Sequence, residues 1–241
     1  MARKTSNTYK TMKKLMYVIA FIFSLLTYTS YAQQTETRNV SSFDEVHVSG
    51  SFEVTLAKGN TESVKIESSS LELSKIETEV EGSKLKIGLE KGTYRNTGTI
   101  KIYVTYKEIE SIHSSGSSSV TCNSELKADN FELHTSGSGS IKITSLNANA
   151  LNIHNSGSSS VEVAGVAKKQ SVNISGSSKI NAFDLQSEQS KVSISGSGNV
   201  NINVTQSLEA RVSGSGDIRY KGNPDIRNIH VSGSGNIKKV N

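Results

Sequence analysis

The five histidines of this chain occupy one position of a repeated pattern. Each lies three residues before the first glycine of a Ser-Gly-Ser motif: His47, His113, His134, His154 and His230. His113, His134 and His154 come from consecutive copies of the motif, so stacked copies would place them about 4.8 Å apart along one outer strand. Imidazoles in such a row indicate two kinds of chemistry, transition-metal binding and a change of charge near neutral pH.

We favour a structural role for this row over a metal site. In later copies the same position holds asparagine, serine or arginine, and no carboxylate or cysteine joins the histidines. Side chains repeated along one face point in parallel, whereas zinc needs three or four ligands that converge on one point. We therefore expect these histidines to be solvent-facing strand residues that bind no metal and no cofactor. The alternative is a metal-binding site formed by His113, His134 and His154.

The serine- and glycine-rich motifs do not match catalytic loops. A dinucleotide site or a P-loop needs one glycine loop that opens a helix, but here seven such loops each lead into a strand-like segment. A nucleophile elbow needs one serine supported by a histidine and an acid, and the repeated serines are interchangeable. The acidic residues of the repeats do not recur at a shared position, as a carboxylate pair in a common groove would require. The sequence therefore predicts no catalytic residues.

The histidines are carried by a repeat of about 20 residues. Its core is Ser-Gly-Ser-Gly/Ser, and successive copies begin 18 to 21 residues apart. The first glycines, which we expect to form structural corners, are Gly116, Gly137, Gly157, Gly176, Gly196, Gly214 and Gly233, with a degenerate upstream copy at Ser49-Gly50-Ser51. Such a period with strand-like flanks is typical of a solenoid, in which each coil buries its apolar face against its neighbours.

Apolar residues alternate with polar ones on both sides of each corner. Val192 and Ile194 precede Gly196, and Val200 and Ile202 follow it. A period of two places each pair on one face of a strand, and a further apolar pair in each coil supplies a third side. The sequence thus predicts an all-β fold, a parallel β-helix with three short strands and three turns in each coil.

Two features of the predicted interior are not aliphatic. Ser114, Thr135 and Asn155 lie two residues before the glycine, where later coils have isoleucine or valine. If this position points inward, the three side chains form a polar stack that hydrogen-bonds from coil to coil. Cys122 is the only cysteine, so it forms no intramolecular disulfide. It aligns with aliphatic residues of the next coils, and we expect a buried residue rather than a nucleophile.

The chain divides into a leader and one folded domain. Residues 1–32 form a predicted signal peptide, with a basic start, an apolar run over residues 15–28 and small residues before Gln33. Residues 33–241 form the β-helix domain. Within it, residues 33–110 are β-rich but irregular and are expected to cover the first open coil, and residues 111–241 carry the regular repeats. A separate N-terminal domain is the alternative.

Export accounts for the basic charge of the full chain. The leader holds five of the 27 basic residues and none of the 22 acidic ones, so cleavage leaves a net charge near zero. A net charge near zero gives no reason to expect a basic surface, and therefore none to expect nucleic acid or anionic lipid as a partner. The apolar run of 14 residues is shorter than the roughly 20 residues of a membrane span. We expect an exported protein, in the periplasm, on the outer surface or secreted, without a membrane span after cleavage.

The order of these features resembles one family of exported bacterial proteins, the putative auto-transporter adhesin, head GIN domain family. The resemblance covers about Phe43 to Asn241. It rests on the segment Phe43–Gly50 (FDEVHVSG), the strand Thr99–Tyr106 and the glycine-serine repeats. Its most specific part is Ser213–Pro224 (SGSGDIRYKGNP), followed by Val231–Ile237 (VSGSGNI).

The resemblance implies a right-handed β-helix and carries over the name adhesin, but it implies no known activity and supplies no catalytic motif. We therefore expect a non-enzymatic exported module, an adhesin or envelope scaffold, with a glycan or another envelope protein as its partner. A carbohydrate-active enzyme (glycosidase or lyase) on a β-helix and a purely structural envelope component are the alternatives. Many relatives resemble lipoproteins, but the leader of this chain has no cysteine.

We predict that the mature protein begins at Gln33. The small side chains of Ser30 and Ala32 fit the site that a signal peptidase recognises. N-terminal sequencing of protein recovered from the cell envelope or the medium measures this directly. A mature form that retains residues 15–28 would show that this segment is a membrane anchor.

Overall fold

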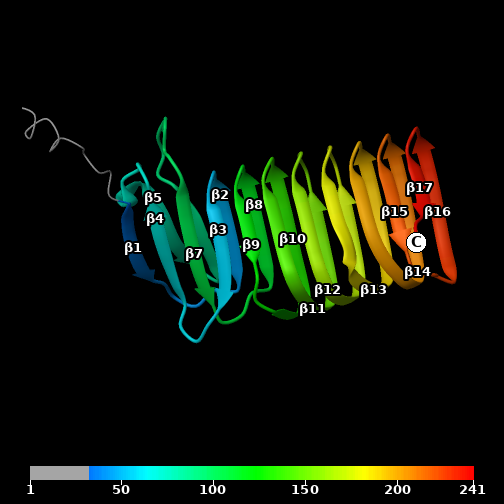
Figure 1. Cartoon of the computed structure of the whole chain (residues 1–241), viewed down its shortest axis with the longest axis horizontal. Helices are drawn as coiled ribbons and strands as arrows, with labels where there is room; N and C mark the ends of the chain where they lie inside the picture. Colours follow the sequence, from blue (N-terminus) through cyan, green and yellow to red (C-terminus); the bar gives the residue numbers. More distant parts are fainter. Residues whose placement is uncertain (1–32) are drawn as a thin grey trace, which may run out of the picture. The chain divides into compact units, whose positions relative to one another are not determined.

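Ladders of strands form the walls of a solenoid (Figure 1). The structure is a computed structural model that describes residues 33–241, which make one compact unit. The predicted signal peptide, residues 1–32, lies outside the described residues. The strands stack as coils about 20 residues apart, which confirms the predicted β-helix. Within residues 33–241, no helix is both long and apolar enough to cross a membrane.

The strands vary in length from four to eighteen residues. Those of the N-terminal part are β1 (Gln34–Asn39), β2 (Glu45–Gly50), β3 (Glu53–Lys58), β4 (Ser63–Ser68), β5 (Ile76–Glu81), β6 (Lys84–Leu89) and β7 (Ile100–Tyr106), with a short 3-10 helix η1 (Leu73–Lys75) before β5. Those of the repeats are β8 (Ser111–Gly116), β9 (Ser119–Cys122), β10 (Leu126–Gly137), β11 (Ser140–Asn155), β12 (Ser160–Ile174), β13 (Lys179–Gly196), β14 (Asn199–Gly214), β15 (Asp217–Lys221), β16 (Ile226–Gly233) and β17 (Asn236–Lys239).

The strand order follows two faces along the whole solenoid, and the long strands add a third side in the regular coils. The first face runs β5–β6–β2–β8–β10–β11–β12–β13–β14–β16. The second runs β1–β4–β7–β3–β9–β11–β12–β13–β14–β15–β17. The long strands β11 to β14 take part in both faces. Pairing is parallel except for β1–β4, β4–β7 and β5–β6 at the N-terminal end, which are antiparallel.

Each regular coil has the three sides that the sequence predicts, including the third side with its apolar pair such as Leu146 and Ala148. Only one of its corners interrupts the strand, so the prediction of three separate short strands joined by three turns is wrong in that respect. The interruption lies at the Ser-Gly motif, as between β11 and β12. On the far side of the coil the strand continues through register shifts, such as those between Ile143 and Leu146 and between Glu162 and Gly165. A β-bulge bends a strand while the ladder on either side of it persists. This local bending replaces the expected turns.

The corner glycines are required by the close approach of neighbouring coils. A Cβ added to Gly137 would lie 2.3 Å from the carbonyl oxygen of Gly116, and the φ of Gly137 is +126°. Gly176 has no positive φ, yet a Cβ there would lie 2.3 Å from the carbonyl oxygen of Gly157. The same carbonyl accepts a hydrogen bond of 2.9 Å from the amide of Ser177. Contact between coils is therefore the constraint that all of these corners share.

The interior confirms the predicted inward and outward assignment. Val192 and Ile194 are buried, and the three residues predicted to form an inward polar stack, Ser114, Thr135 and Asn155, are buried as well. The amide of Asn155 donates to the hydroxyl of Thr135, 2.5 Å away, which is a hydrogen bond between coils. The stack therefore satisfies polar groups that would otherwise be costly to bury.

Cys122 lies in the core, as expected. Its sulfur is 3.5 Å from the hydroxyl oxygen of Tyr106 and donates to the carbonyl oxygen of Ser124, also 3.5 Å away. Burial raises the pKa of the Cys122 thiol, against the smaller opposing effect of the hydrogen bond with Tyr106. A buried thiol with a raised pKa is a poor nucleophile.

The N-terminal part contains a complete first coil. β2 and β3 pair with β8 and β9 on one side and with β6 and β7 on the other. The chain between β3 and β8 therefore folds back to the N-terminal side of this coil. There β1, β4 and β5 close the end of the solenoid with antiparallel pairs.

We predict that Gly176→Ala lowers the free energy of unfolding by about 2–4 kcal/mol, because the new methyl group has no space beside the Gly157 carbonyl. Gly88→Ala is the matched control. Its Cβ would lie 3.8 Å from the nearest atom, the carbonyl oxygen of Ser49, in ordinary contact. We expect that variant to stay within about 0.5 kcal/mol of the native chain. Denaturant unfolding measures both, and equal losses would show that the corner has room for a side chain.

Candidate functional site: a stacked histidine row

Four imidazole rings form a continuous stack on the outer side of the first face. The ring centroids are 4.0 Å apart between His47 and His113, 4.3 Å between His113 and His134, and 4.9 Å between His134 and His154. The ring planes of these pairs differ by 13°, 5° and 15°. We call these four residues the histidine row. Its strand position continues to the last coil through Asn173, Ser193, Arg211 and His230.

His47 is the member of the row that the sequence did not place there. It is separated from His113 by 66 positions of the chain, yet the two residues are directly opposed in the β2–β8 pair. The reason is the fold of the N-terminal part, which leaves the first coil in contact with the regular repeats. The signal in the sequence was the degenerate motif Ser49-Gly50-Ser51, three residues after His47.

Two carboxylates contact the row, so the expectation that no acid joins it is wrong. The Nε2 atom of His47 lies 3.0 Å from an Oε2 atom of Glu45, and that of His134 lies 3.2 Å from Glu132. Each acid stands two residues before its histidine, on the same side of the strand. The hydrogen bond with His47 lowers the pKa of Glu45, and the charge of Lys84, 3.6 Å away, adds to this shift.

The stack changes the proton affinity of its second ring. Burial between its neighbours lowers the pKa of His113 to about 4, and the charges of His47 and His134 act in the same direction. Lys84 also lowers this pKa, whereas Glu45 raises it. A proton on His113 would have to share the stack with two other imidazoles about 4 Å away. The ring is therefore neutral at physiological pH.

The geometry of the stack disfavours a shared metal ion. Glu45, His47 and His113 offer ligand atoms that all lie within 4.8 Å of one another. A nitrogen lone pair lies in the plane of its ring, and these two rings are nearly parallel with centroids 4.0 Å apart. An ion about 2.0–2.1 Å from one nitrogen and in its ring plane lies far outside the plane of the other ring. Both imidazoles would bind it only after one ring had rotated out of the stack.

A long groove follows the histidine row along the first face. Its floor also contains a second row of serines, at the position just before each corner glycine: Ser49, Ser115, Ser136, Ser156, Ser175, Ser195, Ser213 and Ser232. We call this the serine row. At the N-terminal end the groove is lined by β5 and by the connection between β6 and β7, including Tyr94. That connection projects beyond the strand ends (Figure 1).

The corner glycines support this groove rather than bind in it. The seven glycines named from the sequence follow the serine row along the edge of the first face, and each packs against the backbone of the glycine in the preceding coil. They thereby hold neighbouring serines one coil apart. The surface that results is a lattice of hydroxyl and imidazole groups with the spacing of the strands.

Comparison with known proteins agrees with this architecture. A family model described as putative auto-transporter adhesin, head GIN domain, matches residues 42–224. The chain is similar to the crystal structure of a putative adhesin from Bacteroides fragilis, with 25% identity and a TM-score of 0.82 over 88% of this chain and 98% of that one. No curated protein shows significant similarity to it.

Two solved structures from Parabacteroides distasonis are also similar. One is a putative lipid binding protein, with 26% identity and a TM-score of 0.67 over 87% of this chain and 97% of that one. The other is a putative adhesin, with 20% identity and a TM-score of 0.72 over 88% of this chain and 98% of that one, and this likeness shows the fold alone.

We predict that His113 makes the fold less stable in acid. Its pKa is about 4 in the folded chain and about 6.5 when unfolded, so the unfolded chain binds more protons between these values. The contribution of His113 to the free energy of unfolding is therefore fully present above about pH 6.5 and is lost as the pH drops towards 4. We expect a loss of about 1–2 kcal/mol after allowance for the partial exposure of the ring.

The variant that tests this prediction is His113→Asn, because asparagine occupies the same row position at residue 173. Thermal unfolding between pH 4 and pH 7 measures both proteins. The variant should lose part of the pH dependence, whereas His230→Asn in the last coil should keep it. Identical pH profiles for the native chain and His113→Asn would contradict the assignment.

Proposed function

The chain belongs to the putative auto-transporter adhesin, head GIN domain family, and we propose that it is an exported, non-enzymatic binding module of the cell envelope. In this proposal the signal peptide of residues 1–32 directs export, and residues 33–241 bind a partner through the groove of the first face. The partner is a glycan or another envelope component. No metal or cofactor takes part.

The observation that carries this proposal is the regular lattice in the groove. The serine and histidine rows repeat the same polar groups from coil to coil. Hydroxyl and imidazole groups donate and accept hydrogen bonds without requiring a charged ligand. A polymer that presents similar groups at regular spacing would contact several coils at once, and linked weak contacts add up to useful affinity.

The carboxylates of the groove do not favour a glycosidase. Glu77, Glu79 and Glu81 line it from alternate positions of the single strand β5, so they point to the same side. Glu90, which also lines it, forms an ion pair with Lys75, 3.0 Å away. A glycosidase instead needs two carboxyl groups that flank the bond from opposite sides, one of them with a raised pKa. Glu45, which lies beside the row, has a lowered pKa. These features support a binding role over the alternative of a carbohydrate-active enzyme.

The solved structures leave two ligand classes to compare. The Bacteroides fragilis structure described as a putative adhesin supports recognition of a surface glycan or protein, and the one described as a putative lipid binding protein adds lipid as a second class. The serine and histidine rows give this groove hydroxyl and imidazole groups beside carbon-rich surface, so in this proposal a lipid would be recognised through its headgroup. We favour a neutral glycan, because hydroxyl-rich ligands match the serine row.

Binding of residues 33–241 to a glycan array, to peptidoglycan and to phospholipid vesicles tests the proposal. The diagnostic variant is Ser156→Arg, which places a long charged side chain in the serine row. Ser160→Arg is the matched control, because Ser160 is also exposed but begins the strand on the other face. We expect at least a tenfold loss of binding for Ser156→Arg, or about 1.4 kcal/mol, and little change for the control.

The outcomes separate the alternatives. Equal loss in both variants would place the binding site elsewhere. Binding to none of the three probes would favour the purely structural envelope component, and release of reducing ends from a bound glycan would favour the enzyme.

A further inference from the structure

The last coil of the solenoid leaves its interior uncovered. Every residue of β16 is exposed, and the exposed fractions of Ile226, Ile229 and Val231 are 66%, 43% and 39%. Ile229 and Val231 are directly opposed to Ala210 and Val212, which are buried. These side chains therefore belong to the core position of the coil. In a stack of repeats such a surface is normally covered by a polar capping unit.

The opposite end is closed and acidic. The guanidinium of Arg38 on β1 donates to the carbonyl oxygen of Leu73, 2.8 Å away, and to the hydroxyl of Thr78, 3.0 Å away. These contacts tie β1 to η1 and β5 over the core. On the outer side of the first face, beside the groove, β5 presents Glu77, Glu79 and Glu81, all exposed.

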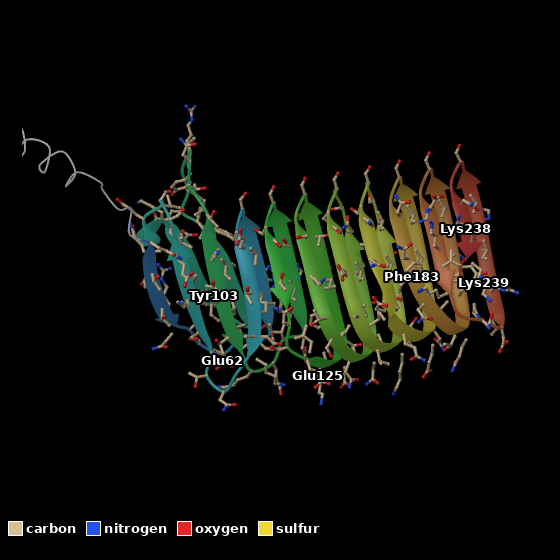
Figure 2. All side chains as sticks on the ribbon, in the orientation of Figure 1. Glu62, Tyr103, Glu125, Phe183, Lys238 and Lys239 are labelled. Atoms are coloured by element: carbon tan, nitrogen blue, oxygen red, sulfur yellow. The ribbon has the colours of Figure 1, made fainter. Side chains whose placement is uncertain are left out.

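The charges of the two ends are complementary. Arg227, Lys238 and Lys239 lie on the last coil, where Figure 2 shows both lysines. Within residues 33–241, neither these three residues nor Glu77 and Glu79 at the other end form an ion pair. An acidic end and a basic end attract one another when two copies approach in the same orientation.

The strand edges of the two ends also correspond. The first face begins with β5 and ends with β16, and the second begins with β1 and ends with β17. Within the described chain, each of these four strands pairs on one side only. A second copy placed along the solenoid axis would bring β16 beside β5 in antiparallel orientation and β17 beside β1 in parallel orientation. Both are normal ladder geometries.

We propose that the protein assembles head to tail, with the last coil of one copy docked on the β1 and β5 end of the next copy. The contact buries Ile229 and Val231. It sets β16, which carries Arg227, beside β5 with Glu77 and Glu79, and β17, which carries Lys238, beside β1 with Glu36. It joins two different surfaces, so it does not close on itself and extends into a filament. Each added copy would continue the groove of the first face, but assembly requires no groove ligand and is independent of the proposed function.

Charge argues against the symmetric arrangement in which two last coils meet. That contact would also bury Ile229 and Val231, but it would oppose Arg227 and Lys238 to the same residues of the second copy. Like charges brought together across an interface oppose association. The head-to-tail contact buries the same apolar side chains of the last coil and does not bring these like charges together.

Sedimentation velocity of residues 33–241, from micromolar to millimolar concentration at low salt, tests the proposal. We expect the average mass to rise above one chain with concentration and to fall when salt is added. A tail variant, Val231→Glu, and a head variant, Glu77→Lys with Glu79→Lys, should each remain a single chain. The matched controls change similar residues in the middle of the solenoid: Val166→Glu, where the valine is 51% exposed, and Glu125→Lys with Glu188→Lys. Both controls should assemble like the native chain.

Mixing the two blocked variants identifies the geometry. The head variant retains an intact tail and the tail variant retains an intact head, so an equimolar mixture should form dimers that grow no further. Dimers of the head variant alone would instead show the symmetric contact and overturn the proposal. A single chain at every concentration, or assembly that neither variant reduces, would overturn it as well.

Discussion

The fixed approach of one coil to the next is the constraint on which the rest of this structure depends. At each corner the backbone of one glycine lies where the side chain of its neighbour would be, and the carbonyl group at that contact also accepts an inter-coil hydrogen bond, as between Gly157 and Ser177. A slip of one residue would turn every buried side chain outward. The corner glycines therefore set the register of the whole solenoid as well as the sharpness of one turn.

Because the register is fixed, each side chain must tolerate a neighbour of equivalent position about 4.8 Å away. The chain meets this condition in three ways. Imidazoles stack face to face in the histidine row. Asn155 and Thr135 form a hydrogen bond in the interior. Lys142 and Glu162, on adjacent coils, form an ion pair of 3.0 Å. The low pKa of His113 is the cost of such stacking, because the stack buries the ring and, to a lesser extent, because its neighbours disfavour a second positive charge.

Much of the fold followed from the sequence because the repeat is regular. The period, the inward residues and the inward stack of Ser114, Thr135 and Asn155 were all visible as alternation around the glycines. The two unbroken corners were not predicted, because a bulge that bends a continuous strand has no characteristic residue comparable to glycine. The carboxylates beside the histidine row were also predictable. Glu45 and Glu132 stand two residues before their histidines, and the period of a strand places such pairs side by side.

What the sequence could not supply was the position of the first coil. The stacking of His47 on His113 depends on where the intervening N-terminal strands fold, and no local pattern in those strands specifies that position. The same long-range arrangement determines where charge lies along the histidine position. Its middle carries imidazole, amide and hydroxyl groups, whereas Glu79 and Lys86 stand at one end and Arg211 near the other. Permanent charges of one sign would repel if stacked on successive coils, so the ladder accommodates them near its ends, where fewer like neighbours surround them. A lattice that suits an uncharged ligand along its length is thus bounded by charged ends.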